Sequence, residues 1–177
     1  KIFTSANNIK GKRKIIFSVV RYGNVFGSRG SVVPFFLSIK NNIFPITHSN
    51  MTRFNINLDE AIDLVLWTFK NSYGGDVIVP KIPSYKLLDL AKAINNKAKF
   101  SIVGIRPGEK IHEEMISEFE SENVYEGKSD YVISNNNIYY KNFKKYKKLR
   151  KSFSYNSFNN FQYLNKKEIQ KLIKSEK

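Results

Sequence analysis

The chain contains no cysteine, so it can form no disulfide and offers no thiolate for catalysis or metal binding. This composition fits a reducing compartment, and we expect a cytoplasmic location. Only two histidines occur, and neither has a second histidine four residues away, so the H-E-x-x-H zinc motif is absent and no metal site is expected. The longest apolar run, around Leu64–Trp67, is too short to span a bilayer and no signal peptide is recognised, so no transmembrane segment is expected.

Acidic residues are also scarce: 15 Asp and Glu stand against 30 Lys and Arg, a net charge of +15. Residues 141–177 hold twelve Lys or Arg against Glu168 and Glu176, a net charge of +10, which leaves +5 for the rest of the chain. No nucleic-acid-binding module is recognisable, so we expect no specific nucleic-acid partner. A basic tail interleaved with Tyr and Phe keeps contact with RNA or an anionic membrane surface open as an alternative.

At 177 residues the chain has the length of about one domain, and strand and helix patterns alternate along it. Strands are expected at residues 15–20 and 77–79, and a helix at 32–40 with Pro34 in its first turn. Further helices are expected after Asn57, after Ser84 as a cap, and at 166–173. Apolar side chains recur at helical spacing and are predicted to be core: Ile62, Val65, Leu66 and Phe69, then Leu87, Leu90, Ala91 and Ile94.

The stretch Arg21–Gly30 joins the end of the first predicted strand to a loop with three glycines. Glycine removes the Cβ atom where a backbone turns or approaches a ligand. Arg21 and Arg29 supply planar donors suited to phosphate oxygens. The G-x-G-x-x-G spacing of a dinucleotide-binding loop is absent. The stretch is therefore either one wall of a phosphate-bearing site or an ordinary exit from a strand.

A second motif, Arg106-Pro107-Gly108-Glu109-Lys110, follows the apolar run 100–105. Its Pro-Gly pair predicts a tight turn with Arg106 and Glu109 on either side, facing a common ligand. The alternative is a surface Arg/Glu pair at the start of a helix, where the helix dipole favours Glu109. Glu113 and Glu114 are expected to belong to a solvated acidic face that continues with Glu118, Glu120 and Glu122.

Together these motifs resemble one family, the inverting UDP-N-acetylglucosamine 4,6-dehydratases, polysaccharide biosynthesis proteins of the extended short-chain dehydrogenase/reductase superfamily. The resemblance covers residues 1–135 and returns faintly at 155–157 and 164–168. The segments that carry it are Arg21–Phe36, Pro45–Thr47, Met51–Phe54, Gly74–Ser84 and Ile102–Glu113.

The resemblance implies an α/β fold, the carboxy-terminal portion of a Rossmann-like enzyme with a small substrate-binding domain. Residues 1–135 would hold the last Rossmann strands and the substrate-binding domain, and residues 136–177 a basic Lys/Asn/Tyr-rich extension. The intact enzyme would be an NADP-dependent lyase: hydride leaves sugar C4, water is lost across C5 and C6, and hydride returns at C6 with inversion at C5. The 4-keto-6-deoxy product would serve the synthesis of surface polysaccharide or glycan, and the intact enzyme would be a homo-oligomer.

Residue roles follow from the same resemblance. Substrate binding is assigned to Asn24, Arg53, Arg106 and Glu109, with the diphosphate and ribose held by Arg106 and Glu109 and with Arg53 on the uridine side. The cofactor would be lined by Val25, Phe26, Gly27, Ser28 and Arg29. Phe26 stands where the family commonly has a smaller aliphatic residue, which would reshape the cofactor wall.

Family members carry the Gly-rich NADP loop and a Tyr-x-x-x-Lys pair upstream of the matched segment, in an amino-terminal Rossmann half absent from these residues. A formal match, Tyr140–Lys144, lies in the basic tail, where such spacing arises by chance. No catalytic residue is therefore assigned, and this chain alone is expected to be inactive. The alternatives are a related nucleotide-sugar epimerase or retaining dehydratase, or a non-catalytic binding fragment.

Overall fold

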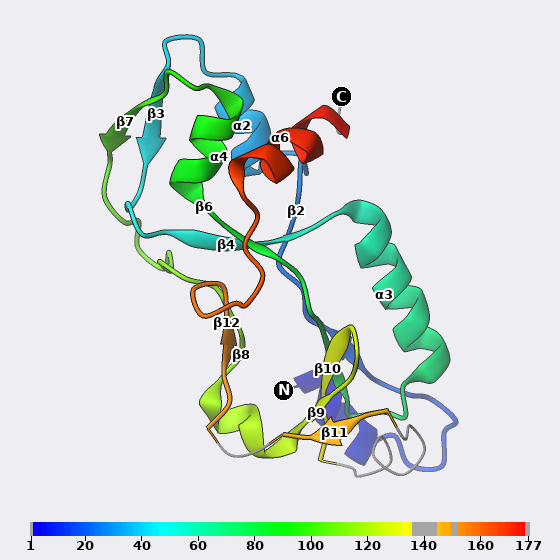
Figure 1. The fold of residues 1–177 in the computed structure, drawn as a ribbon. Coiled ribbons are helices and arrows are strands. Elements are labelled where there is room, and N and C mark those ends of the chain that lie inside the picture. The colour runs from blue at the N-terminus through cyan, green and yellow to red at the C-terminus, as the bar shows by residue number, and fades with distance from the viewer. Residues whose placement is uncertain (1, 136–144, 150–151, 176–177) are drawn as a thin grey trace. The chain divides into compact units, whose positions relative to one another are not determined.

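The structure, a computed structural model, describes residues 2–135, 145–149 and 152–175. Its helices and strands are shown in Figure 1. The chain divides into two compact units, each assembled from three separate segments. Unit 1 comprises Lys1–Tyr22, Asp59–Lys81 and Glu114–Tyr155, and unit 2 comprises Gly23–Leu58, Ile82–Glu113 and Asn156–Lys177. The predicted boundary at residue 135 concerns the domains of the intact protein and stays a prediction.

Unit 1 is built on a five-stranded sheet with the order β1-β5-β10-β9-β11. Its strands are β1 (Val19–Val20), β5 (Val77–Pro80), β9 (Val124–Glu126), β10 (Asp130–Ile133) and β11 (Lys147–Lys148). Strand β1 pairs with β5 in parallel, and the other pairs are antiparallel. The remaining elements are α1 (Ile2–Ser5), η1 (Ala6–Asn8), β8 (Glu114–Ile116) and η2 (Glu118–Asn123). Helix α3 (Leu58–Asn71) and strand β12 (Tyr155–Asn156) also belong here, apart from their terminal residues Leu58 and Asn156, which fall in unit 2.

The first strand is shorter than the pattern at 15–20 predicts. Its pairing with β5 is fixed by the Val19 amide donating to Asp76 O and the Arg21 amide donating to Ile78 O. The residues before it, Ile15 and Ile16, are exposed. A strand at 77–79 is confirmed as β5. The Tyr140–Lys144 match lies outside the described residues.

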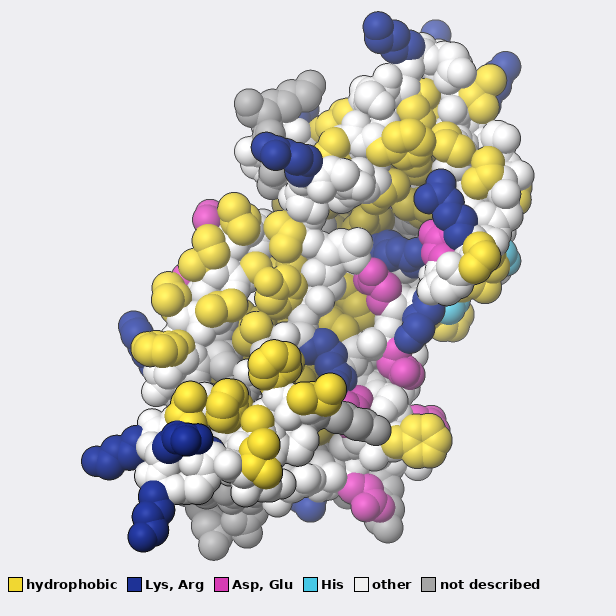
Figure 2. All heavy atoms as spheres, turned by 180° about the vertical axis from the view of Figure 1, so that it is seen from behind, with side chains coloured by type: hydrophobic (Ala, Val, Ile, Leu, Met, Phe, Trp, Pro, Cys, Tyr) yellow, Lys and Arg dark blue, Asp and Glu magenta, His cyan; other side chains and the backbone are white. Residues whose placement is uncertain are grey.

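Helix α3 meets the sheet of unit 1 through a different face from the one predicted. Leu64 and Trp67 pack against buried Ile78 and Val132, and Ala61 is buried as well. The predicted core stripe is instead exposed, by fractions of 47%, 44%, 51% and 86% for Ile62, Val65, Leu66 and Phe69. Figure 2 shows hydrophobic side chains gathered over this helix. The prediction was wrong because two apolar stripes share the helical period, and spacing alone does not say which one packs.

Unit 2 contains a three-stranded sheet, β2-β4-β6, and a parallel pair, β3-β7. The strands are β2 (Asn24–Val25), β3 (Ile43–Ile46), β4 (Thr52–Ile56), β6 (Ser84–Lys86) and β7 (Lys99–Ile102). The helices are α2 (Val32–Leu37), α4 (Leu87–Ile94) and α6 (Lys166–Ser175), so the helices expected at 32–40 and 166–173 are present. The core joins all three helices through Phe36, Leu90 and Ile169.

The stripe predicted on α4 is confirmed, since Leu87, Leu90 and Ala91 are buried and Ile94 packs against the same core. The predicted cap is wrong: Ser84 lies in β6, and Lys86 occupies the position before the helix. Ser84 is held in extended conformation because β6 pairs with β4 on one side. On its other side the Ser84 amide donates to Gln162 O at 2.8 Å.

No helix in the described part of the chain combines the length and the apolar character needed to cross a membrane.

Candidate functional site

The glycine loop begins where β2 pairs in parallel with β4, Asn24 opposite Asn55. Gly23 lies against Phe54, so that an added Cβ would collide with the Phe54 Cβ atom. Glycine is therefore required there by close approach of two strands. Asn24 is the next residue after Gly23, and its side chain is exposed.

All four residues assigned to substrate binding line one cavity of unit 2, with a volume of about 640 Å³. They come from three elements far apart in the sequence: β2 supplies Asn24, β4 supplies Arg53, and the turn after β7 supplies Arg106 and Glu109. The rest of the wall is largely apolar or uncharged and includes Ser31, Val32, Pro34, Phe35, Phe36, Pro45, Thr47, Met51, Leu87 and Val103. A cavity with an apolar wall and a few convergent polar groups is the usual form of a small-molecule site.

Arg53 is the most enclosed charge in this cavity, with 13% of its side chain exposed. Its Nη1 atom donates to Thr52 O at 2.8 Å and to Ile111 O at 3.1 Å. Its Nη2 atom lies 3.6 Å from Glu109 Oε1, and its Nε atom lies 3.8 Å from Glu113 Oε1. The guanidinium is thus held in place by backbone and flanked by two carboxylates.

The Pro-Gly turn is confirmed, because the Glu109 amide donates to Arg106 O at 3.0 Å and Gly108 has a positive φ of 79°. The Arg106 amide donates back to Glu109 Oε2 at 3.3 Å. The guanidinium of Arg106 is exposed and has no hydrogen-bond or ion-pair partner among the described residues. Arg106 is therefore available to an anionic ligand in the cavity.

Glu113 is not part of a solvated acidic face, and that prediction was wrong. Its Oε2 atom accepts a hydrogen bond from the Phe54 amide at 2.8 Å, and 27% of its side chain is exposed. Burial raises the pKa of Glu113, against the opposing effects of the Phe54 amide and the Arg53 charge. Burial and the nearby Glu113 charge also raise the pKa of Tyr85. No local pattern marks Glu113, because its partners lie on a strand about sixty residues earlier in the chain.

The segment assigned to the cofactor does not line this cavity. Val25 pairs with Ile56, and the side chain of Phe26 is buried in the unit 2 core, edge-on to Tyr85 at a centroid distance of 6.5 Å. Phe26 could therefore present only its backbone to a ligand. Ser28 and Arg29 are exposed, and Gly27 has a φ of 70°.

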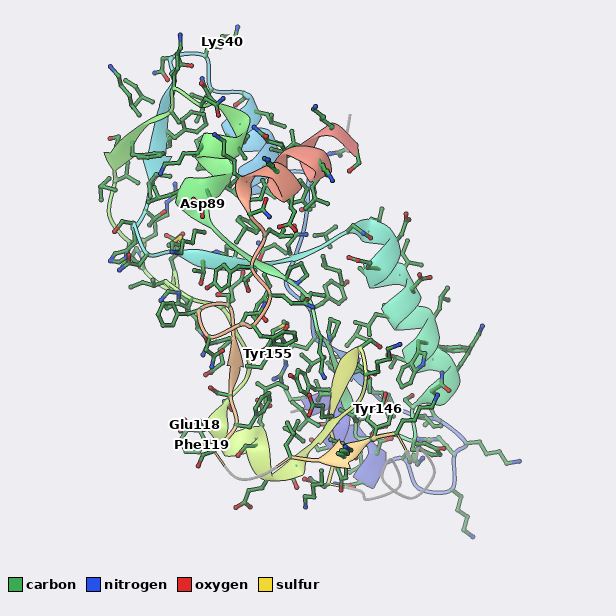
Figure 3. All side chains as sticks on the ribbon, in the orientation of Figure 1. Lys40, Asp89, Glu118, Phe119, Tyr146 and Tyr155 are labelled. Atoms are coloured by element: carbon green, nitrogen blue, oxygen red, sulfur yellow. The ribbon has the colours of Figure 1, made fainter. Side chains whose placement is uncertain are left out.

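Arg21 does not serve as a free phosphate donor. Its guanidinium forms an ion pair with Glu120 at 3.0 Å and donates to Met115 O at 2.6 Å, all within unit 1. Glu120 also accepts from the Ser117 amide, which completes a capping box at the start of η2. Glu118, in contrast, is exposed as expected (Figure 3).

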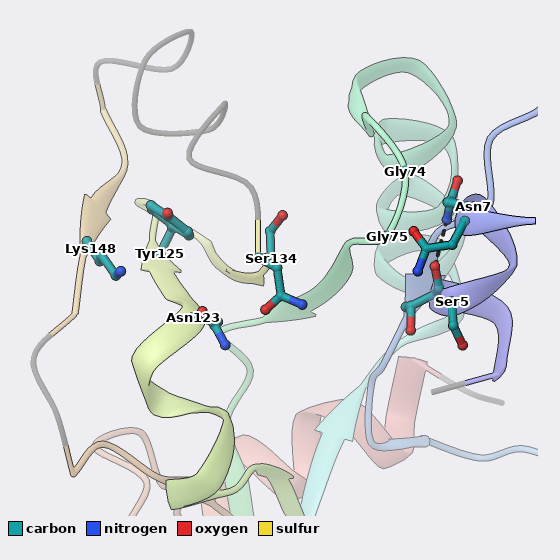
Figure 4. A pocket seen from close by; sticks show the side chains of 11 residues that line it. Ser5, Asn7, Gly74, Gly75, Asn123, Tyr125, Ser134 and Lys148 are labelled. Carbon is teal, nitrogen blue, oxygen red and sulfur yellow. Dashed lines mark hydrogen bonds between the residues drawn. The ribbon is translucent and has the colours of Figure 1, made fainter.

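A larger cavity of about 860 Å³ lies in unit 1 and was not foreseen from the sequence (Figure 4). Asn7 lies in its wall but is already bonded, donating to Thr4 O at 2.9 Å and to Phe17 O at 2.7 Å. Among the described residues, Lys148 is the one charged side chain that lines it. The smaller cavity in unit 2 is the better candidate, because it combines two guanidinium groups with a carboxylate.

The two histidines have other partners, and His48 Nδ1 accepts a hydrogen bond from the Asn50 amide at 3.1 Å. His112 Nδ1 lies 2.8 Å from Thr52 Oγ1, and its ring packs 4.7 Å from the Phe158 ring. Burial, followed by the Arg53 charge, lowers the pKa of His112. In the described part of the chain no cluster of His, Asp or Glu is placed to hold a metal ion.

The arrangement is that of an α/β fold. The solved structure of Pen from Bacillus thuringiensis matches it with a TM-score of 0.85 and 31% identity, over 99% of this chain and 54% of that chain. This confirms the prediction of a portion of a Rossmann-like extended short-chain dehydrogenase/reductase fold.

The chain belongs to the polysaccharide biosynthesis protein family, whose model matches residues 1–135. It is 49% identical over 137 residues to the inverting UDP-N-acetylglucosamine 4,6-dehydratase of Campylobacter jejuni serotype O:2, covering 76% of this chain and 41% of that protein. It is 44% identical over 110 residues to the UDP-glucose 4-epimerase of Rickettsia bellii, covering 59% of this chain and 32% of that protein. The chain thus spans about two fifths of the length of the dehydratase.

Proposed function

We propose that the intact protein is an inverting UDP-N-acetylglucosamine 4,6-dehydratase, a lyase, and that this chain carries its nucleotide-sugar pocket. The observation that carries the proposal is the convergence of Asn24, Arg53, Arg106 and Glu109 on one cavity. The identity of 49% to a dehydratase supports the substrate class. Further support comes from the chemistry of the four side chains, which suits a diphosphate and a ribose.

Each side chain contributes a separate interaction. Arg106 offers an unengaged guanidinium, which binds a diphosphate through two parallel hydrogen bonds. Glu109 accepts hydrogen bonds from ribose hydroxyls. We place Arg53 on the uridine side of the ligand, as a second cation in a partly desolvated wall, where its electrostatic interactions are stronger than in water. The amide of Asn24 orients the sugar, and binding energy collected at the UDP group holds the hexose in a reactive position.

The residues present also fit one edge of a nicotinamide cofactor, which we propose to be NADP. Arg29 is an exposed cation on a loop where Gly27 and Gly30 have positive φ, so the backbone can approach a phosphate closely. In this assignment Arg29 and Ser28 bind the cofactor through side chains, and Val25, Phe26 and Gly27 through backbone. When bound, the cofactor supplies a hydride acceptor for sugar C4 and a hydride donor for C6.

We expect the 177-residue chain by itself to bind UDP but not to turn over UDP-N-acetylglucosamine. Its sequence contains no Gly-rich dinucleotide loop, and its two Tyr-x-x-x-Lys matches, Tyr140–Lys144 and Tyr163–Lys167, lie in the basic tail. Turnover is proposed to need an amino-terminal Rossmann half as partner. Appearance of a 4-keto-6-deoxy product from the purified chain with added NADP would contradict this. Homo-oligomerisation of the intact enzyme and its cytoplasmic location stay predictions.

A UDP-glucose 4-epimerase is the second candidate, favoured by the 44% sequence identity to the Rickettsia bellii enzyme over 110 residues. Both enzymes use the same nucleotide, so the pocket does not discriminate between them. The product does: an epimerase returns a sugar with its C6 hydroxyl, and the dehydratase returns a 4-keto-6-deoxy sugar. Mass spectrometry of the product formed by the full-length protein decides between them. If the full-length protein binds UDP-sugars and forms neither product, a non-catalytic binding role is supported.

Calorimetric titration of UDP into the chain and into Arg106→Ala tests the pocket itself. Loss of a bidentate diphosphate contact should weaken binding by about 1.5–3 kcal/mol. Lys110→Ala is the matched control, because Lys110 is an exposed cation beside the same turn and does not line the cavity. Equal affinity of Arg106→Ala and the parent would remove Arg106 from the site.

A further inference from the structure

The two carboxylates that flank Arg53 are held in different ways. Glu113 is fixed by the Phe54 amide at 2.8 Å, a hydrogen bond to the backbone of the same strand that carries Arg53. Glu109 accepts a longer bond of 3.3 Å from the Arg106 amide, at the far end of an exposed turn. Glu113 is therefore the rigid neighbour of Arg53, and Glu109 is the adjustable one.

The two carboxylates also differ in what they face. Glu109 lines the cavity, together with Arg53 and Arg106. Glu113 does not line the cavity and lies 3.8 Å from Arg53 Nε. Glu109 can therefore meet a ligand directly, whereas Glu113 can act on a ligand only through Arg53.

A ligand that engages Glu109 takes charge compensation away from Arg53. Ribose hydroxyls that donate to Glu109 compete with its 3.6 Å ion pair to Arg53. A guanidinium with 13% of its side chain exposed is costly to leave without an anionic neighbour. The fixed carboxylate of Glu113 removes that cost, because it stays beside Arg53 when Glu109 turns toward the ligand.

We propose that Glu113 is a positioning residue of the nucleotide pocket, which holds Arg53 in the cavity wall while Glu109 exchanges Arg53 for the hydroxyls of a bound nucleoside diphosphate. The inference rests on the proposed function, and it assigns to Glu113 a role in binding without contact to the ligand. Among the described residues, Tyr85, Glu109 and His112 also interact electrostatically with this pair.

The decisive variant is Glu113→Gln, which keeps an oxygen acceptor for the Phe54 amide and removes the charge. UDP affinity of the 177-residue chain, measured by calorimetry, should fall at least about tenfold, the order expected when one partner of a partly buried charge pair is neutralised. Glu114→Gln is the matched control, since it removes the same charge from the exposed neighbouring side chain and should leave affinity unchanged.

A double-mutant cycle separates positioning from general support of the fold. If Glu113 acts through Arg53, Glu113→Gln should have no further effect on UDP affinity in an Arg53→Met background. The same tenfold loss in both backgrounds would overturn the proposal, and so would parent-like affinity of Glu113→Gln. Glu113→Asp, which restores the charge on a shorter side chain, should recover part of the affinity.

A measurement without ligand tests the positioning role of Glu113 separately from the proposed function. The Arg53 Nε–H signal in NMR spectra should exchange slowly with water in the parent and faster in Glu113→Gln. If the parent shows no affinity for UDP, the proposed nucleotide pocket fails. If UDP binds and both the Arg53 signal and the affinity are unchanged in Glu113→Gln, the positioning role fails and the pocket stands.

Discussion

Arg21 and Glu120 are joined by two hydrogen bonds, from Nη1 at 3.1 Å and from Nη2 at 3.0 Å, one to each carboxylate oxygen. The pair links the end of β1 to the start of η2 within unit 1. Because Glu120 also closes a capping box with Ser117, one carboxylate orders both a helix start and a strand end.

This pair predicts a pH dependence of stability. Burial raises the pKa of Glu120, but hydrogen bonds from Arg21 and Ser117 outweigh it and hold the pKa below its ordinary value. A lowered folded-state pKa stabilises the protein above the unfolded-state pKa of about 4.3, and this contribution is lost as the pH falls through the lower folded value. The melting temperatures of the parent and Glu120→Gln should therefore differ most at about pH 6–7 and converge below about pH 4. A constant gap, or the same convergence for the exposed control Glu118→Gln, would count against this explanation.

The exposed stripe of α3 makes a prediction about folding stability. Phe69 is 86% exposed, so Phe69→Ser should change the free energy of unfolding by no more than about 0.5 kcal/mol. Phe36 is 1% exposed, and Phe36→Ala should cost about 3–5 kcal/mol. Urea denaturation of the two variants measures both values. A large loss for Phe69→Ser would mean that this face is covered in solution.

Gly23 tests the contact between β2 and β4. A Cβ atom there collides with Phe54, so Gly23→Ala should force the strands apart and cost about 1–3 kcal/mol. UDP affinity should fall with it, because Asn24 and Arg53 sit on these two strands. Gly11→Ala is the control: its φ of 60° disfavours alanine, but no atom lies within 4 Å of the new Cβ, so only stability should change.

Asn24 tests the assignment of the sugar site. In the full-length enzyme, or in a chimera with a family amino-terminal half, Asn24→Ala should lower kcat far more than it lowers the melting temperature, since loss of substrate orientation enters the barrier directly. Both values are measured on one preparation. A lowered melting temperature with unchanged kcat would show that Asn24 only supports the loop.

Local features were predictable from the sequence, and long-range partners were not. The Pro-Gly turn at Arg106–Glu109 and the helix at 166–173 follow from residues within a few positions of each other, and both are present. The partner of Glu113 lies on β4 and that of Arg21 lies on η2, so neither could be read from a neighbouring residue.

The convergence of the four pocket residues was expected only through the family resemblance. They lie between residues 24 and 109, and no periodic pattern connects them. The packing of α3 could not be decided from its sequence either, because Ala61, Leu64 and Trp67 form a stripe that competes with the more apolar one at Ile62, Val65 and Phe69. The sheet packs against the face of α3 that carries Trp67, and helical spacing alone does not predict which face packs.

Helix α6 limits how early unit 2 can fold while the chain is being synthesised. Ile169 and Ile173 fill the same core as Phe36 and Leu90, although they come much later in the chain. The core of unit 2 therefore cannot form completely until α6 has left the ribosome. Until then, apolar side chains of the earlier strands stay exposed. Ribosome-bound chains ending before Lys166 should accordingly be the forms most dependent on chaperones.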